Sequence, residues 1–293
     1  MQNRFRRHLL RSRRKAAQLT LKYLHRLLKQ RNIGAIFGLV KRFSSTQSLH
    51  RHPLHVQAKA LITAHRGASA YAPENTLAAV SLALQFRPDF IEIDVHLSRD
   101  HQVVLLHDES LDRTTNGSGK IWQQSLAELN HLDAGSWFSA RFDSERIPTL
   151  KEVIQLVKGH VKLDIEVKSH PEQLGLVDHT LNVIAELDFE QQCIITSFDR
   201  DALAEVHSRN PNISIGLITS SGIPTNMYKE PYDYFMCAAN IVDRELVAHI
   251  HQVGKKIHVW TVNRAANMRR FLRMGVDGII TNRPDVLREI LFV

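Results

Sequence analysis

Cysteine is scarce in this chain, and no apolar run is long enough to cross a membrane. The 293 residues include two cysteines, Cys193 and Cys237, so the fold is not a disulfide framework and nothing indicates an oxidising compartment. Cys193 opens the apolar run CIITSF and is expected in the core. The apolar segment at residues 33–40 has eight residues, whereas a membrane-spanning helix needs ~20.

Acidic residues are missing from the first 57 positions. Residues 1–57 hold 14 of the 38 Lys and Arg residues and no Asp or Glu, whereas the rest of the chain has 24 basic and all 30 acidic residues, a net charge of −6. The overall charge of +8 therefore combines a basic arm with a mildly acidic body. We expect two units: residues 1–57, a partly helical arm and linker, and residues 58–293, the folded domain.

The arm has the pattern of an amphipathic helix. Leucines within residues 21–28 share one helical face, and basic side chains lie elsewhere on it. Such a helix favours an anionic membrane surface, so we expect a cytoplasmic protein that binds the inner face of the membrane peripherally. A solvated extension without a specific partner is the main alternative. A targeting peptide or nucleic-acid binding is weaker, and we expect neither a nucleic-acid partner nor a signal peptide.

From residue 58 onward, short apolar strands alternate with segments of helical periodicity. The strands are expected to begin near residues 61, 90, 161, 193, 213, 239, 257 and 278. Such alternation implies an α/β fold with a parallel sheet covered by helices. Eight units fit a (β/α)8 TIM barrel, which typically has ~250 residues. A doubly wound sheet is the alternative, but the glycine-rich phosphate loop that would follow its first strand is absent.

One segment interrupts the alternation. Residues 103–106 are predicted to form a side ribbon next to the second strand, and residues 109–147 show no clear periodicity. We interpret this segment as a small insertion after the second strand of the barrel.

Three carboxylates stand out in otherwise apolar strands. Side chains alternate along a strand, so Glu92 and Asp94 point to the same face. A carboxylate pair in a buried strand needs a metal ion, a cation or a shared proton. Glu166, which shares a strand face with Lys168, supplies a third carboxylate. Three hard oxygen ligands suit Mg²⁺ or Ca²⁺ better than Zn²⁺, so we expect one divalent metal ion.

Histidines and cations follow the ends of neighbouring strands, where the active sites of barrels form. His65 and Arg66 end the first strand, and His107 ends the side ribbon. Arg66 and Lys168 are suited to an anionic group such as a phosphate. His65 and His107 can act as a general base and a general acid. A metal ion, two cations and two histidines around one anion indicate phosphodiester cleavage.

Five motifs together resemble the glycerophosphodiester phosphodiesterase family: HRGASAYAPENT, EIDVHLSRDHQVVLLHD, LDIEVK, VWTVN and GVDGIITNRPD. The resemblance covers about residues 60–290. It implies a metal-dependent barrel that hydrolyses small-molecule glycerophosphodiesters, for example glycerophosphocholine or glycerophosphoethanolamine, to an alcohol and sn-glycerol 3-phosphate. By this resemblance the acid/base pair is His65 and His107, the metal ligands are Glu92, Asp94 and Glu166, and the substrate-binding residues are Arg66, Lys168 and Trp260.

Alternatives remain within this interpretation. A lysophospholipid could replace the glycerophosphodiester, and the neighbouring hydroxyl of the substrate could replace water as the nucleophile, which would give a cyclic phosphate. A non-catalytic barrel that binds a phosphorylated ligand is the alternative from another class. Among nearby polar residues we expect Asp164 to be structural, His96 not to bind the metal, and His258 to be an ordinary strand residue. Asn75 or Thr76 is expected to cap the first helix, and Glu74 and Asn75 are expected either to cap it or to contact the site.

Overall fold

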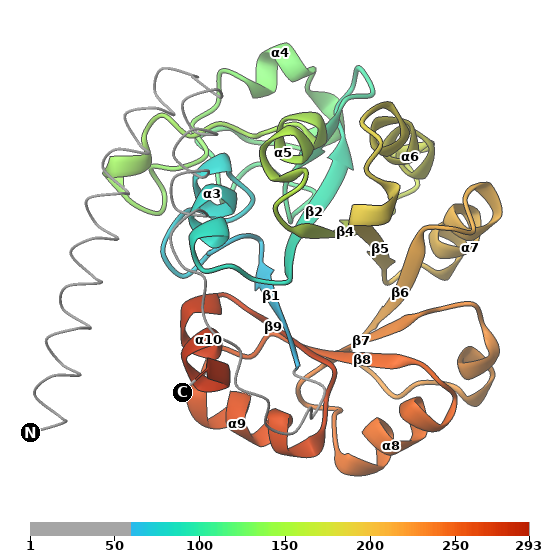
Figure 1. The fold of residues 1–293 in the computed structure, drawn as a ribbon. Coiled ribbons are helices and arrows are strands. Elements are labelled where there is room, and N and C mark those ends of the chain that lie inside the picture. The colour runs from blue at the N-terminus through green and yellow to red at the C-terminus, as the bar shows by residue number, and fades with distance from the viewer. Residues whose placement is uncertain (1–59, 293) are drawn as a thin grey trace, which may run out of the picture. The chain divides into compact units, whose positions relative to one another are not determined.

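Eight parallel strands close into a barrel within residues 60–292, the part of the chain that the computed structural model describes (Figure 1). The strands are β1 (Leu61–His65), β2 (Phe90–Leu97), β4 (Lys162–Val167), β5 (Cys193–Ser197), β6 (Ser214–Thr219), β7 (Tyr234–Ala238), β8 (Lys256–Trp260) and β9 (Gly278–Thr281). They pair in that order, and β1 pairs with both β2 and β9, which closes the barrel. The (β/α)8 prediction is confirmed, and the arm at residues 1–57 lies outside the described residues.

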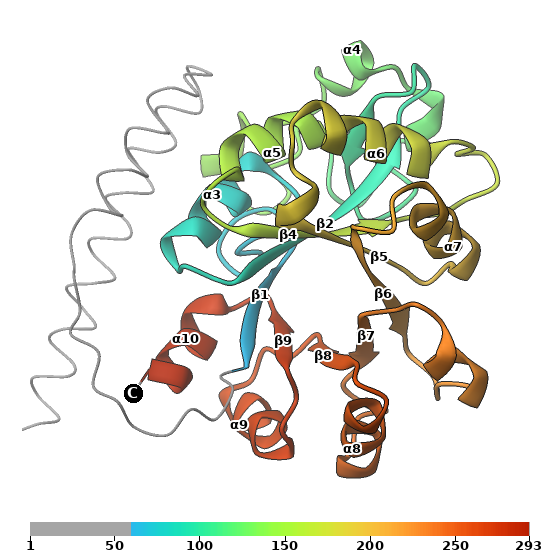
Figure 2. The same cartoon turned by 45° about the vertical axis from the view of Figure 1, so that its right-hand side comes forward.

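Helices surround the barrel on its outer side (Figures 1 and 2). They are α3 (Leu77–Gln85), α5 (Leu150–Val157), α6 (Leu176–Glu186), α7 (Arg200–Arg209), α8 (Arg244–Gln252), α9 (Ala265–Met274) and α10 (Pro284–Phe292). Between β6 and β7 the connection is a short 3-10 helix, η4 (Thr225–Lys229). None of the helices within residues 60–292 combines the length and the hydropathy that crossing a bilayer requires.

Helix α5 illustrates why these segments are helical. The Thr149 side chain accepts a hydrogen bond from the Glu152 backbone N–H at 3.2 Å, and the Glu152 carboxylate accepts one from the Thr149 backbone N–H at 2.9 Å. This reciprocal capping satisfies backbone donors at the start of the helix. The buried side chains then recur at helical spacing: Leu150, Val153, Ile154, Leu156 and Val157.

The sixth predicted strand, near residue 239, was wrong. Residues 239–242 form a turn, in which the Ile241 N–H donates to the Ala238 carbonyl at 3.1 Å, and the strand is β7, five residues earlier. The sequence of β7, YFMCA, lacks β-branched residues, whereas Ile and Val occur in the turn. Pairing on both sides decides the outcome, because Tyr234 lies opposite Gly216 of β6 and Ala238 lies opposite Trp260 of β8.

The insertion after β2 is confirmed and has its own core. Strand β3 (Val103–Leu105) pairs antiparallel with β2, as expected for the side ribbon. The remainder contains η1 (Ile121–Gln123), α4 (Leu126–Leu129) and η2 (Ala140–Phe142). One apolar cluster holds this segment together, and it consists of Val104, Leu106, Leu111, Ile121, Leu129, Ala134 and Ile147.

The interior of the barrel is filled below the site. His258 is fully buried, and its ring meets the ring of Tyr234 at 5.2 Å and that of Phe90 at 6.2 Å, both edge to face. Burial lowers the pKa of His258 to about 4, so the ring is neutral. A Cβ on Gly278 would lie 2.5 Å from this ring, so glycine makes room for it. His258 is therefore an interior packing residue, in a strand as the sequence predicted.

Candidate active site

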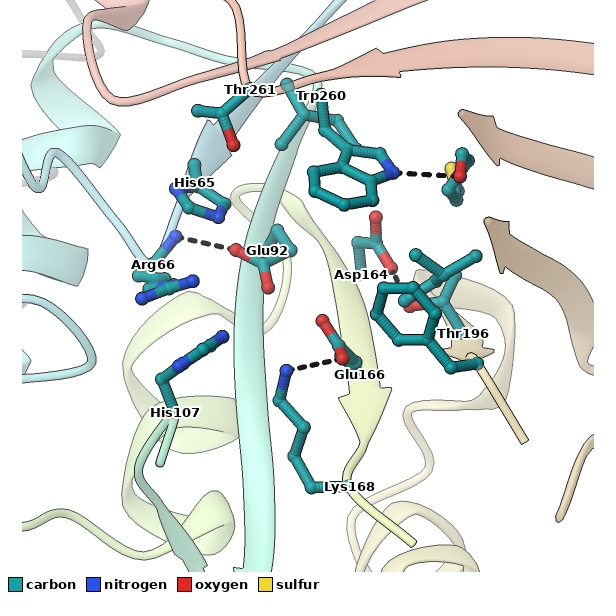
Figure 3. A pocket seen from close by; sticks show the side chains of 14 residues that line it. His65, Arg66, Glu92, His107, Asp164, Glu166, Lys168, Thr196, Trp260 and Thr261 are labelled. Carbon is teal, nitrogen blue, oxygen red and sulfur yellow. Dashed lines mark hydrogen bonds and ion pairs between the residues drawn. The ribbon is translucent and has the colours of Figure 1, made fainter. Parts of the chain in front are cut away.

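A pocket of about 390 Å³ opens where the C-terminal ends of the strands meet (Figure 3). Seven of the eight predicted site residues line it: His65, Arg66, Glu92, His107, Glu166, Lys168 and Trp260. The eighth, Asp94, is completely buried beside them. The structure therefore brings the whole predicted set together, although its members come from five different strands or strand ends.

The three predicted metal ligands lie on neighbouring strands. Glu166 on β4 is in register with Asp94 on β2, and Glu92 lies two residues before Asp94 on the same face. Each of the three carboxylates offers an oxygen, and these oxygens all lie within 4.8 Å of one another. The predicted cluster is thus a compact, buried set of oxygen donors.

The electrostatics of the cluster favour a cation. Burial, together with the Asp94 charge, raises the pKa of Glu92 well above its usual value, and the pKa of Glu166 is raised for the same two reasons. Burial opposes ionisation of Asp94 too, but the charges of Lys168 and Arg66 outweigh it and lower the pKa of Asp94. The nearby cations therefore do not compensate the charges of Glu92 and Glu166. A hard divalent ion would supply the missing positive charge, and the donor set fits Mg²⁺ or Ca²⁺.

The turn after β1 depends on its backbone conformation. Arg66 and Gly67 both have positive φ angles, 54° and 81°. A Cβ on Gly67 would lie 2.6 Å from the backbone carbon of Ala79, so only glycine lets this turn pack against α3. The tight turn keeps Arg66 at the edge of the pocket.

Arg66 is bound by three carboxylates. Its backbone N–H donates to Glu92 Oε2 at 2.7 Å, and its Nη1 donates to Glu74 Oε1 at 2.8 Å. Its Nε lies 3.3 Å from Asp94 Oδ2. These contacts fix the guanidinium beside the acidic cluster, where a bound anion would meet it.

Lys168 occupies the other side of the cluster. Its Nζ lies 2.9 Å from Asp94 Oδ1 and also forms an ion pair with Glu166. The lysine side chain is largely sheltered, and its ammonium group lies at the pocket wall. Figure 3 shows Lys168, His65 and His107 directed toward the carboxylates of the cluster.

The two histidines have different partners. His65 Nδ1 lies 2.7 Å from Asn282 Oδ1, and His107 Nδ1 lies 2.6 Å from Asp108 Oδ1. Amide and carboxylate oxygens only accept hydrogen bonds, so each histidine carries its proton on Nδ1 and leaves Nε2 for the pocket. Burial and the Arg66 charge lower the pKa of His65 to about 4, and burial also lowers the pKa of His107.

Two asparagines complete the site. A contact of Asn75 with the site was one of two alternatives from the sequence, and Asn282 was not predicted as a site residue. Asn75 Nδ2 donates to Asp94 Oδ2 at 2.7 Å, and the Asp94 backbone N–H donates to Asn75 Oδ1 at 3.2 Å. Thr76, not Asn75, caps α3, since its hydroxyl accepts from the Ala79 N–H. Asn282 holds His65 from the end of β9. The sequence signal for Asn282 was its position as a polar residue at the end of a strand. The sequence signal for Asn75 was only that its turn lies close to His65.

Other polar residues near the pocket have structural partners. Asp164 accepts a hydrogen bond from the Thr196 hydroxyl at 2.7 Å, and burial raises its pKa to about 7. His96 is buried, with Nδ1 2.7 Å from Gln173 Nε2 and Nε2 3.4 Å from the His107 carbonyl. Neither residue belongs to the group of three potential metal ligands. Both expectations from the sequence are consistent with these contacts.

The opposite wall of the pocket is apolar. Trp260 is anchored by its Nε1, which donates to the Met236 carbonyl at 2.8 Å, and its ring meets that of Phe198 edge to face at 5.9 Å. Phe198 is 51% exposed although it is aromatic. Ile218 also lines this wall. The pocket therefore has one charged side and one side suited to the carbon skeleton of a ligand.

Comparison with known proteins gives one consistent result. A sequence model described as the glycerophosphoryl diester phosphodiesterase family matches residues 65–286. The chain is 41% identical to a glycerophosphodiester phosphodiesterase of Caldanaerobacter subterraneus over 80% of this chain and 98% of that protein. A Bacillus subtilis glycerophosphodiester phosphodiesterase is 33% identical, with 78% and 86% covered. A phosphodiesterase structure from Oleispira antarctica, in complex with the product sn-glycerol-3-phosphate, is similar with TM-score 0.72 and 32% identity, covering 79% of this chain and 96% of that one.

Proposed function

We propose a mechanism from the fact that this chain belongs to the glycerophosphoryl diester phosphodiesterase family and is an enzyme of that class. The enzyme uses a divalent metal ion and two histidines to hydrolyse glycerophosphodiesters. The substrates are small molecules such as glycerophosphocholine or glycerophosphoethanolamine, and the products are an alcohol and sn-glycerol 3-phosphate. The observation that supports this most is the convergence of two histidines, two cations and three carboxylates on one pocket.

The acidic cluster would hold the metal. Glu92, Asp94 and Glu166 provide the oxygen donors, and the ion would be Mg²⁺ or Ca²⁺. When bound, such an ion offsets charge on phosphoryl oxygens and polarises the phosphorus toward attack. Arg66 and Lys168 flank the cluster and would contact the remaining phosphate oxygens, the guanidinium by a forked pair of hydrogen bonds and the ammonium as a point charge.

The partners of the histidines assign their roles. His65 is paired with a neutral amide and its lowered pKa keeps it unprotonated, so its Nε2 can take a proton from the attacking water. His107 is paired with the carboxylate of Asp108, which stabilises its doubly protonated imidazolium form, and in that form Nε2 can donate a proton to the leaving alcohol oxygen. The water oxygen bonds to phosphorus as the bond to the alcohol oxygen breaks. The water proton passes to His65 Nε2, which becomes protonated, and the alcohol oxygen takes the Nε2 proton of His107, which becomes neutral.

A second substrate class is favoured by the apolar wall. Phe198 and Trp260 present aromatic surface at the pocket, and the acyl chain of a lysophospholipid would bury it. Attack by a neighbouring hydroxyl of such a substrate would release the alcohol and leave a cyclic phosphate. A non-catalytic phosphate-binding barrel has less support, because such a protein needs no acid/base pair beside its cations.

One experiment tests the proposal. The full chain is incubated with glycerophosphocholine or a lysophospholipid, with Mg²⁺, Ca²⁺ or a chelator, and the products are identified by phosphorus NMR. We expect sn-glycerol 3-phosphate from glycerophosphocholine and a loss of at least ~100-fold on chelation, reversed by the preferred metal. Unchanged turnover in chelator would overturn the metal dependence. A cyclic phosphate product would show that the nucleophile is the hydroxyl of the substrate and not water.

The basic arm, residues 1–57, would bring the enzyme to the inner face of an anionic membrane. Its net positive charge and leucine pattern support this peripheral, cytoplasmic placement. Sedimentation with vesicles of phosphatidylserine and phosphatidylcholine compares the full chain with residues 58–293. We expect only the full chain to pellet, with weaker binding at high salt. Equal binding of the two would discard the membrane role.

A further inference from the structure

Arg113 from the insertion contacts two carboxylates at once. Its Nε donates to Asp108 Oδ2 at 2.6 Å and its Nη2 to Asp108 Oδ1 at 3.1 Å. Its Nη2 also donates to Glu74 Oε1 at 2.8 Å, and its Nη1 to Glu74 Oε2 at 3.1 Å. Only the planar fork of a guanidinium can make both forked contacts together; a lysine ammonium cannot.

Each of these carboxylates holds a residue of the site. Asp108 accepts from His107 Nδ1, and Glu74 accepts from Arg66 Nη1. Arg113 thus joins two segments that lie about forty residues apart, the turn after β1 and the loop after β3. It does not line the pocket itself. Any effect of Arg113 on the reaction must pass through its two carboxylate partners.

The network is more than an ordinary surface ion pair. An isolated exposed pair contributes little to stability, but here the Glu74 side chain is only 15% exposed and each carboxylate has two cationic or imidazole partners. Hydrogen bonding to Arg113 lowers the pKa of Asp108 to about 2. The carboxylate therefore stays ionised, and an ionised oxygen fixes the His107 proton on Nδ1.

The insertion places Arg113 rigidly. The N–H and the hydroxyl of Thr115 both donate to the Leu111 carbonyl, at 3.1 and 2.7 Å, which closes a tight turn around Arg113. Leu111 is buried in the apolar cluster of the insertion. The core of the insertion thus determines where the guanidinium lies.

We infer that Arg113 is a positioning residue, which clamps Asp108 and Glu74 so that His107 and Arg66 keep their orientation toward the substrate. This rests on the proposed function, since it assumes that His107 takes part in the reaction. It assigns a role to the part of the insertion that follows Asp108, which supplies no pocket residue to the proposed chemistry.

The test compares Arg113→Met and Arg113→Lys with Arg99→Met. Arg99 is the matched control, because it also bridges to the insertion, through Glu128 at 2.8 Å, but has no contact with the site. We expect Arg113→Met to lower kcat by about 10- to 100-fold, with a smaller change in KM, since a displaced reacting group costs rate rather than binding. Arg113→Lys should recover part of the loss, and Arg99→Met should behave like the wild type.

A double-variant cycle shows whether the effect passes through Asp108. If it does, Asp108→Asn combined with Arg113→Met loses little more than Asp108→Asn alone. Additive losses both in this cycle and in the same cycle with Glu74→Gln, or equal kcat for Arg113→Met and Arg99→Met, would overturn the inference. If Arg113→Met does not fold, the same double-variant cycle is measured with Arg113→Lys. The variant His107→Ala separates failure of the proposed function from failure of the Arg113 inference. Full activity of His107→Ala would overturn the proposed function. An inactive His107→Ala together with a fully active Arg113→Met would overturn only the positioning role of Arg113.

Discussion

The two histidines of this site are held by different parts of the molecule. His65 is supported by the barrel itself, since Asn282 reaches it from the end of the last strand, 217 residues away in sequence. His107 is supported by its own neighbour Asp108, which the insertion residue Arg113 holds in turn. One support is neutral and sheltered, and the other is ionic and partly exposed.

This difference separates two demands of the reaction. A base must stay unprotonated, and burial together with the charge of Arg66 achieves that for His65, since both lower its pKa. An acid must tolerate a positive charge, and a carboxylate beside His107 provides for it. The barrel thus supplies a dry position for one proton transfer, and the insertion completes the charged position for the other.

Removing the histidines has the largest expected effect, and a change of leaving group tells them apart. His65→Ala and His107→Ala should each lose about 10²- to 10⁴-fold in kcat with glycerophosphocholine, the usual contribution of general acid–base catalysis. With the 4-nitrophenyl phosphodiester of glycerol, whose leaving group needs no proton, His107→Ala should recover most of its rate. His65→Ala should not, because attack still requires a base. Equal recovery in both variants would contradict the assignment of acid and base.

Replacing the two supports should give unequal losses. Asp108→Asn removes a charged acceptor and can reverse the His107 tautomer, so we expect a loss of about 10- to 100-fold in kcat. Asn282→Ala removes only a neutral acceptor from His65, so about three- to tenfold is expected, since neutral hydrogen bonds are roughly half as strong as charged ones. Steady-state kinetics on glycerophosphocholine measures both variants. A larger loss of kcat for Asn282→Ala than for Asp108→Asn would contradict the expectation that the charged support of His107 contributes more than the neutral support of His65.

The sequence predicted the barrel and the acidic cluster because both follow from local pattern. Runs of Val and Ile mark most strands, and alternation alone places Glu92 and Asp94 on one face. Strand β7 was misplaced because YFMCA has no β-branched residue, whereas Ile and Val occur in the turn after it, and because pairing with β6 and β8 decides the register. The residues within one segment do not show which strands that segment will pair with.

The supporting residues were beyond the reach of local pattern. Asn75 reaches Asp94 only because the turn after β1 has positive φ angles. Arg113 lies in a stretch without periodicity, and its partners are set by how the insertion packs. Reacting residues therefore show in the sequence through their chemistry, whereas the residues that orient them become visible only in three dimensions.

The smallest expected effect concerns the contact between the insertion and the barrel. Glu145 of the insertion is buried, and its Oε2 accepts a hydrogen bond from the Ala78 N–H in the first turn of α3 at 3.2 Å. Burial raises the pKa of Glu145 from 4.5 to about 7. The folded state therefore binds this proton more tightly than the unfolded state, so the stabilisation is complete below pH 4.5 and is lost as the pH rises through 7.

Glu145→Gln mimics the protonated side chain and keeps an oxygen for Ala78, so its stability should lack this pH dependence. At pH 8 we expect the variant to exceed the wild type by about 3 kcal/mol in the free energy of unfolding, and at pH 4.5 the two should be nearly equal. Urea unfolding at both pH values measures the difference, with Glu172→Gln at an exposed position as the control. A gain of the same size at both pH values would mean that the variant acts through packing. A pH-dependent gain that leaves kcat unchanged would show that the insertion can be stabilised against the barrel without disturbing the support of His107.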